Sequence, residues 1–331
     1  MLKNFYNKIL GILICLIVAV TAIFISVYSP IPTMMACLLM GMALNFMSKA
    51  SLTKDGVQYT SRSILRIGVA LIGARIVLLD FTALGAPMIM LVILTTIAII
   101  IFGVLLARVI GADKEQGLLI AGATAICGGS AALAIAASMP NSKNLEKNTL
   151  IAVIGVTAIG TIAMILYPLI IAILGFNDYE AGILIGGAIH DVAQVVGAGY
   201  SVSTDAGDSA VIIKLIRVSM LVPIVFILAF MFGRSKKRDE EKPPIVPLFI
   251  IGFIALAALN SFHLIPADIT DILKNASKYM LMMAIVAVGM KTSFKEVMSL
   301  RWKPIALIII NTIAIFSIYL SILSINLFTQ E

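Results

Sequence analysis

The stretch Ile183 to Gly199, ILIGGAIHDVAQVVGAG, decides how the rest of the chain is interpreted. It has the composition of a membrane segment, yet it carries His190, Asp191 and Gln194 at its centre. An Asp at mid-bilayer disfavours insertion by roughly 2.5–3.5 kcal/mol, so an ionisable residue inside a span indicates a functional site. The alternative is a contact between helices that share hydrogen bonds.

Glycines flank these polar residues, at Gly186, Gly187, Gly197 and Gly199. If the segment is one helix, spacings of three and four residues place the polar side chains on one side. The glycines then allow a close approach of another backbone, or they let the helix break and turn its N–H and C=O groups toward a bound ion.

Composition places the whole chain in a membrane. Of its 331 residues, 61% are hydrophobic and 12% are charged, whereas soluble domains have about 45–50% apolar residues. Long apolar runs between short charged breaks indicate helices rather than the alternating strands of an outer-membrane barrel. The sequence therefore predicts an all-α polytopic membrane protein in which residues 1–331 form a single transmembrane domain.

Apolar segments that could be transmembrane helices number about eleven. They cover residues 9–28, 31–47, 63–80, 86–108, 116–138, 148–174, 181–200, 210–232, 245–262, 278–291 and 304–327. Two of them, 31–47 and 278–291, are short for a bilayer core about 30 Å thick, so we expect each to be tilted, extended or broken.

Lysine and arginine in the connections predict the orientation, because these residues concentrate on the cytoplasmic side. With the N-terminus inside and the C-terminus outside, sixteen of the 24 basic residues fall in inside connections. The outside connections hold four, which are Lys143, Lys147, Lys274 and Lys278. The net charge of +7 thus reflects topology rather than nucleic-acid binding. The charged break 233–247 is then a cytoplasmic loop, either a solvated linker or a site for anionic lipid.

Two pairs of segments resemble each other. Residues 67–81 match 283–297, and the charge count gives them opposite directions, which suggests the inverted repeats found in transporters. Residues 117–129 also match 181–193, but the same topology makes those two parallel. The two matches do not fit one simple repeat order.

A second candidate site lies in residues 122–134, GATAICGGSAALA. Its residues of interest are Thr124, Cys127, Gly128, Gly129 and Ser130. A Gly-Gly pair inside a membrane helix favours an unwound segment, whose half-helix N-terminus offers N–H groups and a positive dipole end that suit an anion. The alternative is a packing seam of small residues.

Lys214 and Arg217 stand three apart on one face of an apolar segment. A buried cationic pair needs a counter-charge, which could come from Asp191, from an anionic substrate, or from lipid headgroups reached by snorkelling. Arg75 raises the same three possibilities, with Asp80 as a further partner.

Signatures of enzymes, metals and cofactors are absent from the sequence. There is no HExxH, G-x-S-x-G or P-loop motif, and Cys15, Cys37 and Cys127 have no CxxC spacing. A thiol and base pair of Cys127 with His190 is the remaining enzymatic interpretation. We expect no enzyme, because a span-buried Cys usually behaves as a small hydrophobe.

Four stretches together resemble the bacterial sulfate exporter family, a conserved family of integral membrane proteins of unknown function. They are ATAICGGSAALAIAASMP (123–140), GAIHDVAQVVGAGYS (187–201), AGDSAVIIKLIRVSMLVP (206–223) and GMKTSFKEV (289–297). The resemblance covers essentially the whole chain, and the Cys-Gly-Gly-Ser and His-Asp-Val-Ala-Gln strings carry most of its specificity.

That family is distantly similar to the bile acid/sodium symporters. The resemblance implies inverted repeats, two crossing discontinuous helices, an alternating-access cycle and a place in the bacterial cell membrane. It also implies that Cys127, Gly128, Gly129 and Ser130 lie at one helix break, and that the residues from His190 to Gln194 face this break across the transport site.

The resulting hypothesis is a secondary transporter that exports a small anion such as sulfate, sulfite or an organosulfonate. The N–H groups of the helix break, with Lys214 or Arg217, would hold the anion, and His190 and Asp191 would take up a coupling H⁺ or Na⁺. The alternative is a cation/proton antiporter in which Asp191 binds the cation and Lys214 is structural. The lipid bilayer and further copies of the chain complete the expected partners.

Overall fold

The computed structural model describes residues 2–76, 85–140, 142–232, 248–292 and 300–325, and these ranges contain helices and no strand. The all-α prediction is therefore confirmed. The chain divides into two compact units. Unit 1 comprises Met1–Leu84, Val196–Asp208 and Pro247–Ser293, and unit 2 comprises Gly85–Val195, Ser209–Val246 and Phe294–Glu331. The single transmembrane domain stays a prediction.

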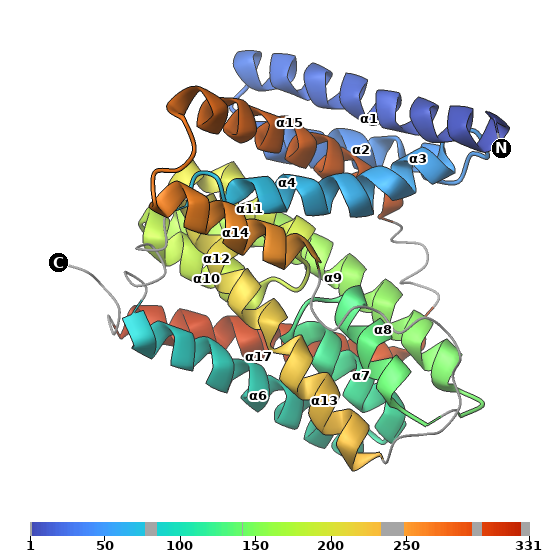
Figure 1. Ribbon diagram of the computed structural model, residues 1–331. Helices are drawn as coiled ribbons and strands as arrows, with labels where there is room; N and C mark the ends of the chain where they lie inside the picture. The colour runs from blue at the N-terminus through green and yellow to red at the C-terminus, as the bar shows by residue number, and fades with distance from the viewer. Residues whose placement is uncertain (1, 77–84, 141, 233–247, 293–299, 326–331) are drawn as a thin grey trace. The chain divides into compact units, whose positions relative to one another are not determined.

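Unit 1 is organised around one long helix, α15 (Ala267–Lys291), which packs against α1, α2 and α4 (Figure 1). Its other helices are α1 (Leu2–Tyr28), α2 (Thr33–Ala43), η1 (Asn45–Ser48), α3 (Lys54–Tyr59), η2 (Thr60–Ile64), α4 (Leu65–Ile72) and α14 (Leu248–Ser261). A Cβ placed on Gly41 of α2 would lie 2.3 Å from the Val286 carbonyl oxygen. Glycine therefore lets the α2 and α15 backbones touch.

The direction of α15 relative to α4 follows from two hydrogen bonds. Ser277 Oγ donates to the Gly68 carbonyl at 2.8 Å, and Lys291 Nζ reaches Ser61 Oγ at 3.3 Å. Residue numbers thus rise along α15 as they fall along η2 and α4, so the helices are antiparallel. This agrees with the opposite directions predicted for the segments that contain them, although residues 77–81 and 293–297 of those segments lie outside the described ranges.

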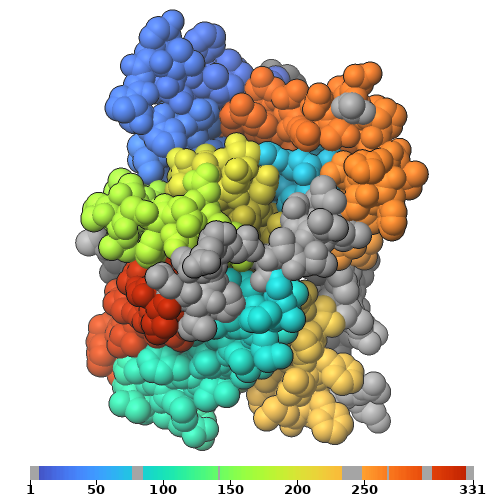
Figure 2. Space-filling view, turned by 90° about the vertical axis from the view of Figure 1, so that its left-hand side faces the viewer, coloured from blue at the N-terminus to red at the C-terminus, as the bar shows by residue number. Residues whose placement is uncertain are grey.

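Unit 2 contains the remaining helices. They are α6 (Gly85–Ile110), α7 (Lys114–Ala125), α8 (Gly129–Ser138), α9 (Leu145–Leu174), α10 (Asp178–Ala188), α13 (Leu221–Met231) and α17 (Trp302–Ser324), with parts of α11 (Val192–Val202) and α12 (Thr204–Ser219). Figure 2 shows α6 and α17 side by side on its surface. Its core joins Ile120 of α7, Ile135 of α8, Val156 of α9 and Ile308 of α17.

The structure supports a multi-pass membrane protein. Six described helices are long and apolar enough to cross a bilayer, and four shorter apolar helices accompany them. The six are Asn7–Tyr28, Gly85–Ile110, Leu145–Leu174, Thr204–Met231, Asp268–Lys291 and Trp302–Ser324. The number eleven is thus not confirmed. Of the two short segments, 278–291 is extended as α15, whereas 31–47 is divided into α2 and η1.

The predicted span 116–138 is wrong as a single crossing. A Cβ on Gly122 of α7 would lie 2.1 Å from Ile135 Cδ1 of α8, although residues thirteen apart in a straight helix are separated by about 20 Å. At the other end of the pair, Ser142 Oγ donates to Glu115 Oε2 at 2.6 Å, and Asn148 Nδ2 donates to Asp113 Oδ2 at 3.1 Å. Helices α7 and α8 therefore form a hairpin whose two ends lie together.

This hairpin corrects the predicted orientation in one place. Lys143 and Lys147 were expected on the opposite side from Arg108 and Lys114. The hydrogen bonds of Glu115 and Asp113 to the 142–148 segment place all four basic residues at the same end of unit 2. The predicted loop 233–247 and the proposed Arg75 partner Asp80 lie outside the described residues.

Candidate functional site

Both sequence-predicted sites contain a helix break in unit 2. Helix α7 ends at Ala125, and α8 begins at Gly129 after Gly128, whose backbone angles are φ 65° and ψ −132°. Only glycine adopts that combination without strain, which explains why the Gly-Gly pair marks the break. Helix α10 ends at Ala188 and α11 begins at Val192. His190 and Asp191 thus lie between helices and do not share one helical face with Gln194.

Arg217 of α12 binds the carbonyl groups that both breaks leave without helical partners. Its Nε and Nη2 donate to the Ala125 oxygen at 3.0 and 2.6 Å, and Nη2 also donates to Thr124 at 2.9 Å. On the α10 side, Nη1 donates to Gly187 at 2.7 Å and to Ile189 at 2.9 Å. One guanidinium therefore caps the C-termini of α7 and α10 together.

Lys214, one turn earlier on α12, makes a second link between the two breaks. Its Nζ donates to the Ile126 carbonyl at 2.7 Å and to the Ile189 carbonyl at 2.9 Å. Both Lys214 and Arg217 have 0% exposure. Helix C-termini carry partial negative charge, so two converging C-termini supply the counter-charge that the cationic pair requires. This arrangement excludes the snorkelling alternative for these two residues.

Asp191 and Gln194 cap the start of α11 with their side chains. Asp191 Oδ1 accepts the Ala193 N–H at 2.9 Å, while Gln194 Oε1 accepts the Asp191 N–H at 3.3 Å. The Gln194 amide also donates to the Thr157 carbonyl at 2.7 Å and to Thr161 Oγ1 at 3.2 Å. Gln194 therefore fastens the N-terminus of α11 to α9 and has no donor left for a ligand.

The accessible part of the site lies at the N-terminus of α8. A Cβ placed on Gly128 would lie 3.5 Å from Asp191 Oδ2, so the carboxylate stands beside the first turn of this helix. Ser130 is exposed, and Gly129 and Asp191 are partly exposed. A positive helix end and a negative side chain thus meet at a part of unit 2 that is not fully buried.

His190 is buried and binds on both sides. Its Nδ1 lies 3.2 Å from the Thr124 carbonyl oxygen, and its Nε2 lies 2.8 Å from Thr312 Oγ1. A carbonyl only accepts, so Nδ1 carries the hydrogen toward Thr124. The Thr312 hydroxyl also lies 2.8 Å from the Ile308 carbonyl oxygen, so its single hydrogen is shared between that oxygen and His190 Nε2. The imidazole connects the break at α7 to α17.

The predicted site residues therefore separate into two groups. Gly129, Ser130 and Asp191 are at least partly accessible. The other predicted residues are buried, and they are Thr124, Cys127, Gly128, His190, Gln194, Lys214 and Arg217. The last four connect the breaks to neighbouring segments by hydrogen bonds. The Thr124 hydroxyl donates to the Ile120 and Ala121 carbonyl oxygens of its own helix.

Arg75 finds its partner in unit 1. Its Nε lies 3.1 Å from Asp208 Oδ2, and its guanidinium lies 5.9 Å from the centre of the Tyr200 ring. The Tyr200 hydroxyl donates to Asp208 Oδ1 at 2.5 Å. The acidic segment before Lys214 thus supplies a carboxylate to Arg75.

Thr312, Thr157 and Thr161 belong to the site but were missed from the sequence. Thr312 and its neighbour Asn311 are buried polar residues in an otherwise apolar helix. The reasoning applied to His190 and Asp191 would have selected this pair as well. Thr157 and Thr161 carry no such signal, because isolated threonines are common in membrane helices.

Comparisons with known proteins agree on one family. The family described as conserved hypothetical protein 698 matches residues 10–323. A UPF0324 membrane protein of Chlorobaculum tepidum is 44% identical over 306 residues, which cover 92% of this chain and 86% of the relative. UPF0324 membrane protein TauZ of Paracoccus denitrificans is 42% identical over 307 residues, which cover 92% and 91%. No solved structure matches the chain.

Proposed function

The chain belongs to the UPF0324 membrane protein family, and we propose that it is a secondary transporter that exports a small anion across the cell membrane. Sulfate, sulfite and organosulfonates are the proposed substrate class. The proposal assigns no covalent chemistry to the protein and therefore no enzymatic activity. The observation that carries it is the pairing of the accessible α8 N-terminus with the Asp191 carboxylate.

The N–H groups of the first turn of α8, with the exposed Ser130 hydroxyl, form the proposed anion site. A helix N-terminus favours negative charge through its dipole and through N–H groups that have no helical acceptor. In this proposal Lys214 and Arg217 do not touch the anion, because both side chains are completely buried and donate to carbonyl groups of the two breaks. They keep the two breaks in place.

Asp191 gives the site a coupling group. An anion at the α8 N-terminus and an ionised Asp191 carboxylate would repel each other across a few ångströms of low dielectric. Protonation of Asp191, or a Na⁺ bound to it, removes that repulsion and lets the anion enter. The proposal thus predicts that anion and coupling cation bind together, with Asp191 rather than His190 as the site of coupling.

The antiporter remains the second candidate function, and one observation favours it. Asp191 is a partly exposed carboxylate at a helix break, and Lys214 has the structural position that this hypothesis requires. In that case Asp191 alternates between H⁺ and Na⁺, and no anion moves.

The test is flux into proteoliposomes with labelled sulfate, sulfite and taurine, for the wild type, for Asp191→Asn and for the control Asp178→Asn. Asn also caps helices, so Asp191→Asn should preserve the fold. We expect wild-type flux of one anion to depend on pH or Na⁺, and the Asp191→Asn variant to lose that dependence. Asp178, an exposed acid at the start of α10, should behave as wild type.

Two outcomes would contradict the anion proposal. Cation exchange that needs no anion would establish the antiporter instead. Unchanged pH and Na⁺ dependence in Asp191→Asn would remove the coupling role of this carboxylate.

A further inference from the structure

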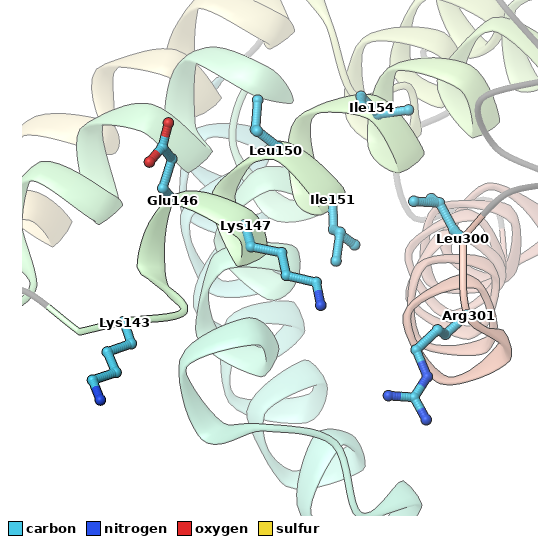
Figure 3. Close-up of a pocket in the computed structure, with 8 residues that line it drawn as sticks. All are labelled: Lys143, Glu146, Lys147, Leu150, Ile151, Ile154, Leu300 and Arg301. Atoms are coloured by element: carbon cyan, nitrogen blue, oxygen red, sulfur yellow. The ribbon is translucent and has the colours of Figure 1, made fainter.

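A cavity of about 530 Å³ lies in unit 2, apart from the helix breaks. Figure 3 shows its lining, which comes from the start of α9 and from the residues that precede α17. The residues are Lys143, Glu146, Lys147, Leu150, Ile151, Ile154, Leu300 and Arg301. The volume falls within the roughly 300–1,000 Å³ of small-molecule sites.

The charged part of the lining favours an anion. Lys143, Lys147 and Arg301 contribute three positive charges against one carboxylate, Glu146. In Figure 3 the Glu146 carboxylate points away from the Lys147 ammonium, and no salt bridge between them occurs among the described contacts. Lys147 and Arg301 belong to different elements, so together they can bind one phosphate group from two sides.

The other part of the lining is apolar. Leu150, Ile151, Ile154 and Leu300 continue the cavity along α9 and toward α17. Leu150 is 55% exposed, which in a membrane helix indicates contact with acyl chains rather than with water. A ligand that fills the cavity therefore needs an anionic end and a hydrocarbon end.

The level of the cavity in the membrane follows from Trp302. This residue begins α17 directly after Arg301 and is 66% exposed. Tryptophan concentrates at the boundary between hydrocarbon and headgroups. Arg301 and the first turn of α9 thus lie at headgroup depth, with the aliphatic residues below them.

We propose that this cavity binds the phosphate headgroup of an anionic membrane lipid, with Lys147 and Arg301 on the phosphate and Leu150, Ile154 and Leu300 against the acyl chains. A free phosphate-type anion shares the headgroup chemistry but lacks the hydrocarbon end. The proposal is independent of transport, because the hydrogen bonds described at the helix breaks involve none of these residues.

Native mass spectrometry of the delipidated, detergent-solubilised protein tests it. The protein is titrated with phosphatidylglycerol, with phosphatidylcholine of the same chains, and with inorganic phosphate. The variant is Lys147→Gln with Arg301→Gln, and the control is Lys114→Gln, which removes an exposed charge at the same end of unit 2 but outside the cavity.

We expect the wild type and Lys114→Gln to bind one phosphatidylglycerol at least about tenfold more tightly than phosphatidylcholine. The double variant should lose that preference. Arg301→Gln alone, at an exposed position, should lose part of it and serves if the double variant fails to fold.

Three results would overturn the proposal. The first is equal binding of the two lipids by the wild type, and the second is an unchanged lipid preference in both glutamine variants. The third is inorganic phosphate that binds as tightly as phosphatidylglycerol and is lost in the variant, because the site would then serve a free anion.

Discussion

Arg217 illustrates how a single side chain holds the candidate site together. Its guanidinium reaches carbonyl groups of both α7 and α10, and the side chain is completely buried. A planar fork with five donors suits such a set of acceptors, whereas a lysine ammonium is a compact charge with three. Lys214 reaches two carbonyls from its neighbouring position.

Arg217→Lys should therefore destabilise the protein although it keeps the charge. Several buried carbonyls would lose their donors, and we expect a loss of about 3–5 kcal/mol in unfolding free energy, as when a buried charged group loses its partners. Thermal unfolding in detergent measures this loss of stability as a lower melting temperature. The matched control is Arg108→Lys at an exposed position, which should melt as the wild type does. Equal melting temperatures for both variants would refute the capping role.

Residue types predicted where the chain departs from helical structure better than they predicted the contacts of each side chain. Asp191 and Gln194 were selected because polar residues are rare in apolar spans, and they do lie at a break. Their spacing suggests one helical face, whereas in the structure both side chains cap the start of α11. The Asp-x-x-Gln pattern is a known helix-start signal, so this part could have been predicted. The convergence of carbonyl groups on Lys214 and Arg217 could not have been predicted from the sequence, because it depends on contacts between residues about ninety positions apart.

At the scale of elements, the break between α7 and α8 depends on the conformation of Gly128. Its φ of 65° with ψ of −132° is open to glycine alone. The Gly-Gly pair predicted an unwound segment here, and the structure confirms one. It did not predict that α8 turns back along α7, because sequence shows where a helix stops but not the direction in which the chain continues.

Gly128→Ala should disrupt this break. The added Cβ imposes backbone strain of about 1–3 kcal/mol, although its distance of 3.5 Å to Asp191 Oδ2 would be an ordinary contact. Gly252→Ala in α14 is the control, because its Cβ would meet only an ordinary contact at 3.4 Å, and alanine stabilises helix interiors by roughly 0.5–1 kcal/mol over glycine. The melting temperature should therefore fall below that of the wild type for Gly128→Ala and rise above it for Gly252→Ala. If Gly128→Ala melts at or above the wild-type temperature, the backbone description of the break is incorrect.

For the whole molecule, the contacts within unit 2 constrain how often the chain crosses the bilayer. Arg301 lines one cavity with Lys143 and Lys147, and Lys303 Nζ donates to the Gly111 carbonyl at 2.7 Å. We infer that these residues lie on one side of the membrane, which requires an even number of crossings between Lys147 and Arg301. Five segments were predicted in that interval, and the broken segment 181–200 is the one that best fits a second re-entrant loop.

This revised topology strengthens the charge asymmetry. With segments 116–138 and 181–200 both re-entrant, Lys143 and Lys147 move to the inside connections. Eighteen basic residues then lie in inside connections, and two, Lys274 and Lys278, lie in outside connections. The positive-inside rule is therefore better satisfied than by eleven crossings.

Sided labelling tests the topology. Single cysteines at Lys114→Cys and Lys143→Cys should react with a membrane-impermeant maleimide from the same side of oriented vesicles, and Lys274→Cys should react from the other side. The native Cys15, Cys37 and Cys127 are buried, so they should contribute little background. Labelling of positions 114 and 143 from opposite sides would contradict the hairpin.

Helix α9 links the protein to the thickness of its host membrane. It runs for 30 residues and contains Pro168, so at 1.5 Å per residue it is about 45 Å long, against a hydrocarbon core of about 30 Å. The excess of about 15 Å has to be absorbed by tilt, by a proline kink, or by turns that project among the headgroups. Hydrophobic mismatch thus acts on the same helix that holds Gln194 in place and lines the lipid cavity. Acyl-chain length is a physical variable through which a bilayer can bias the conformation of this protein.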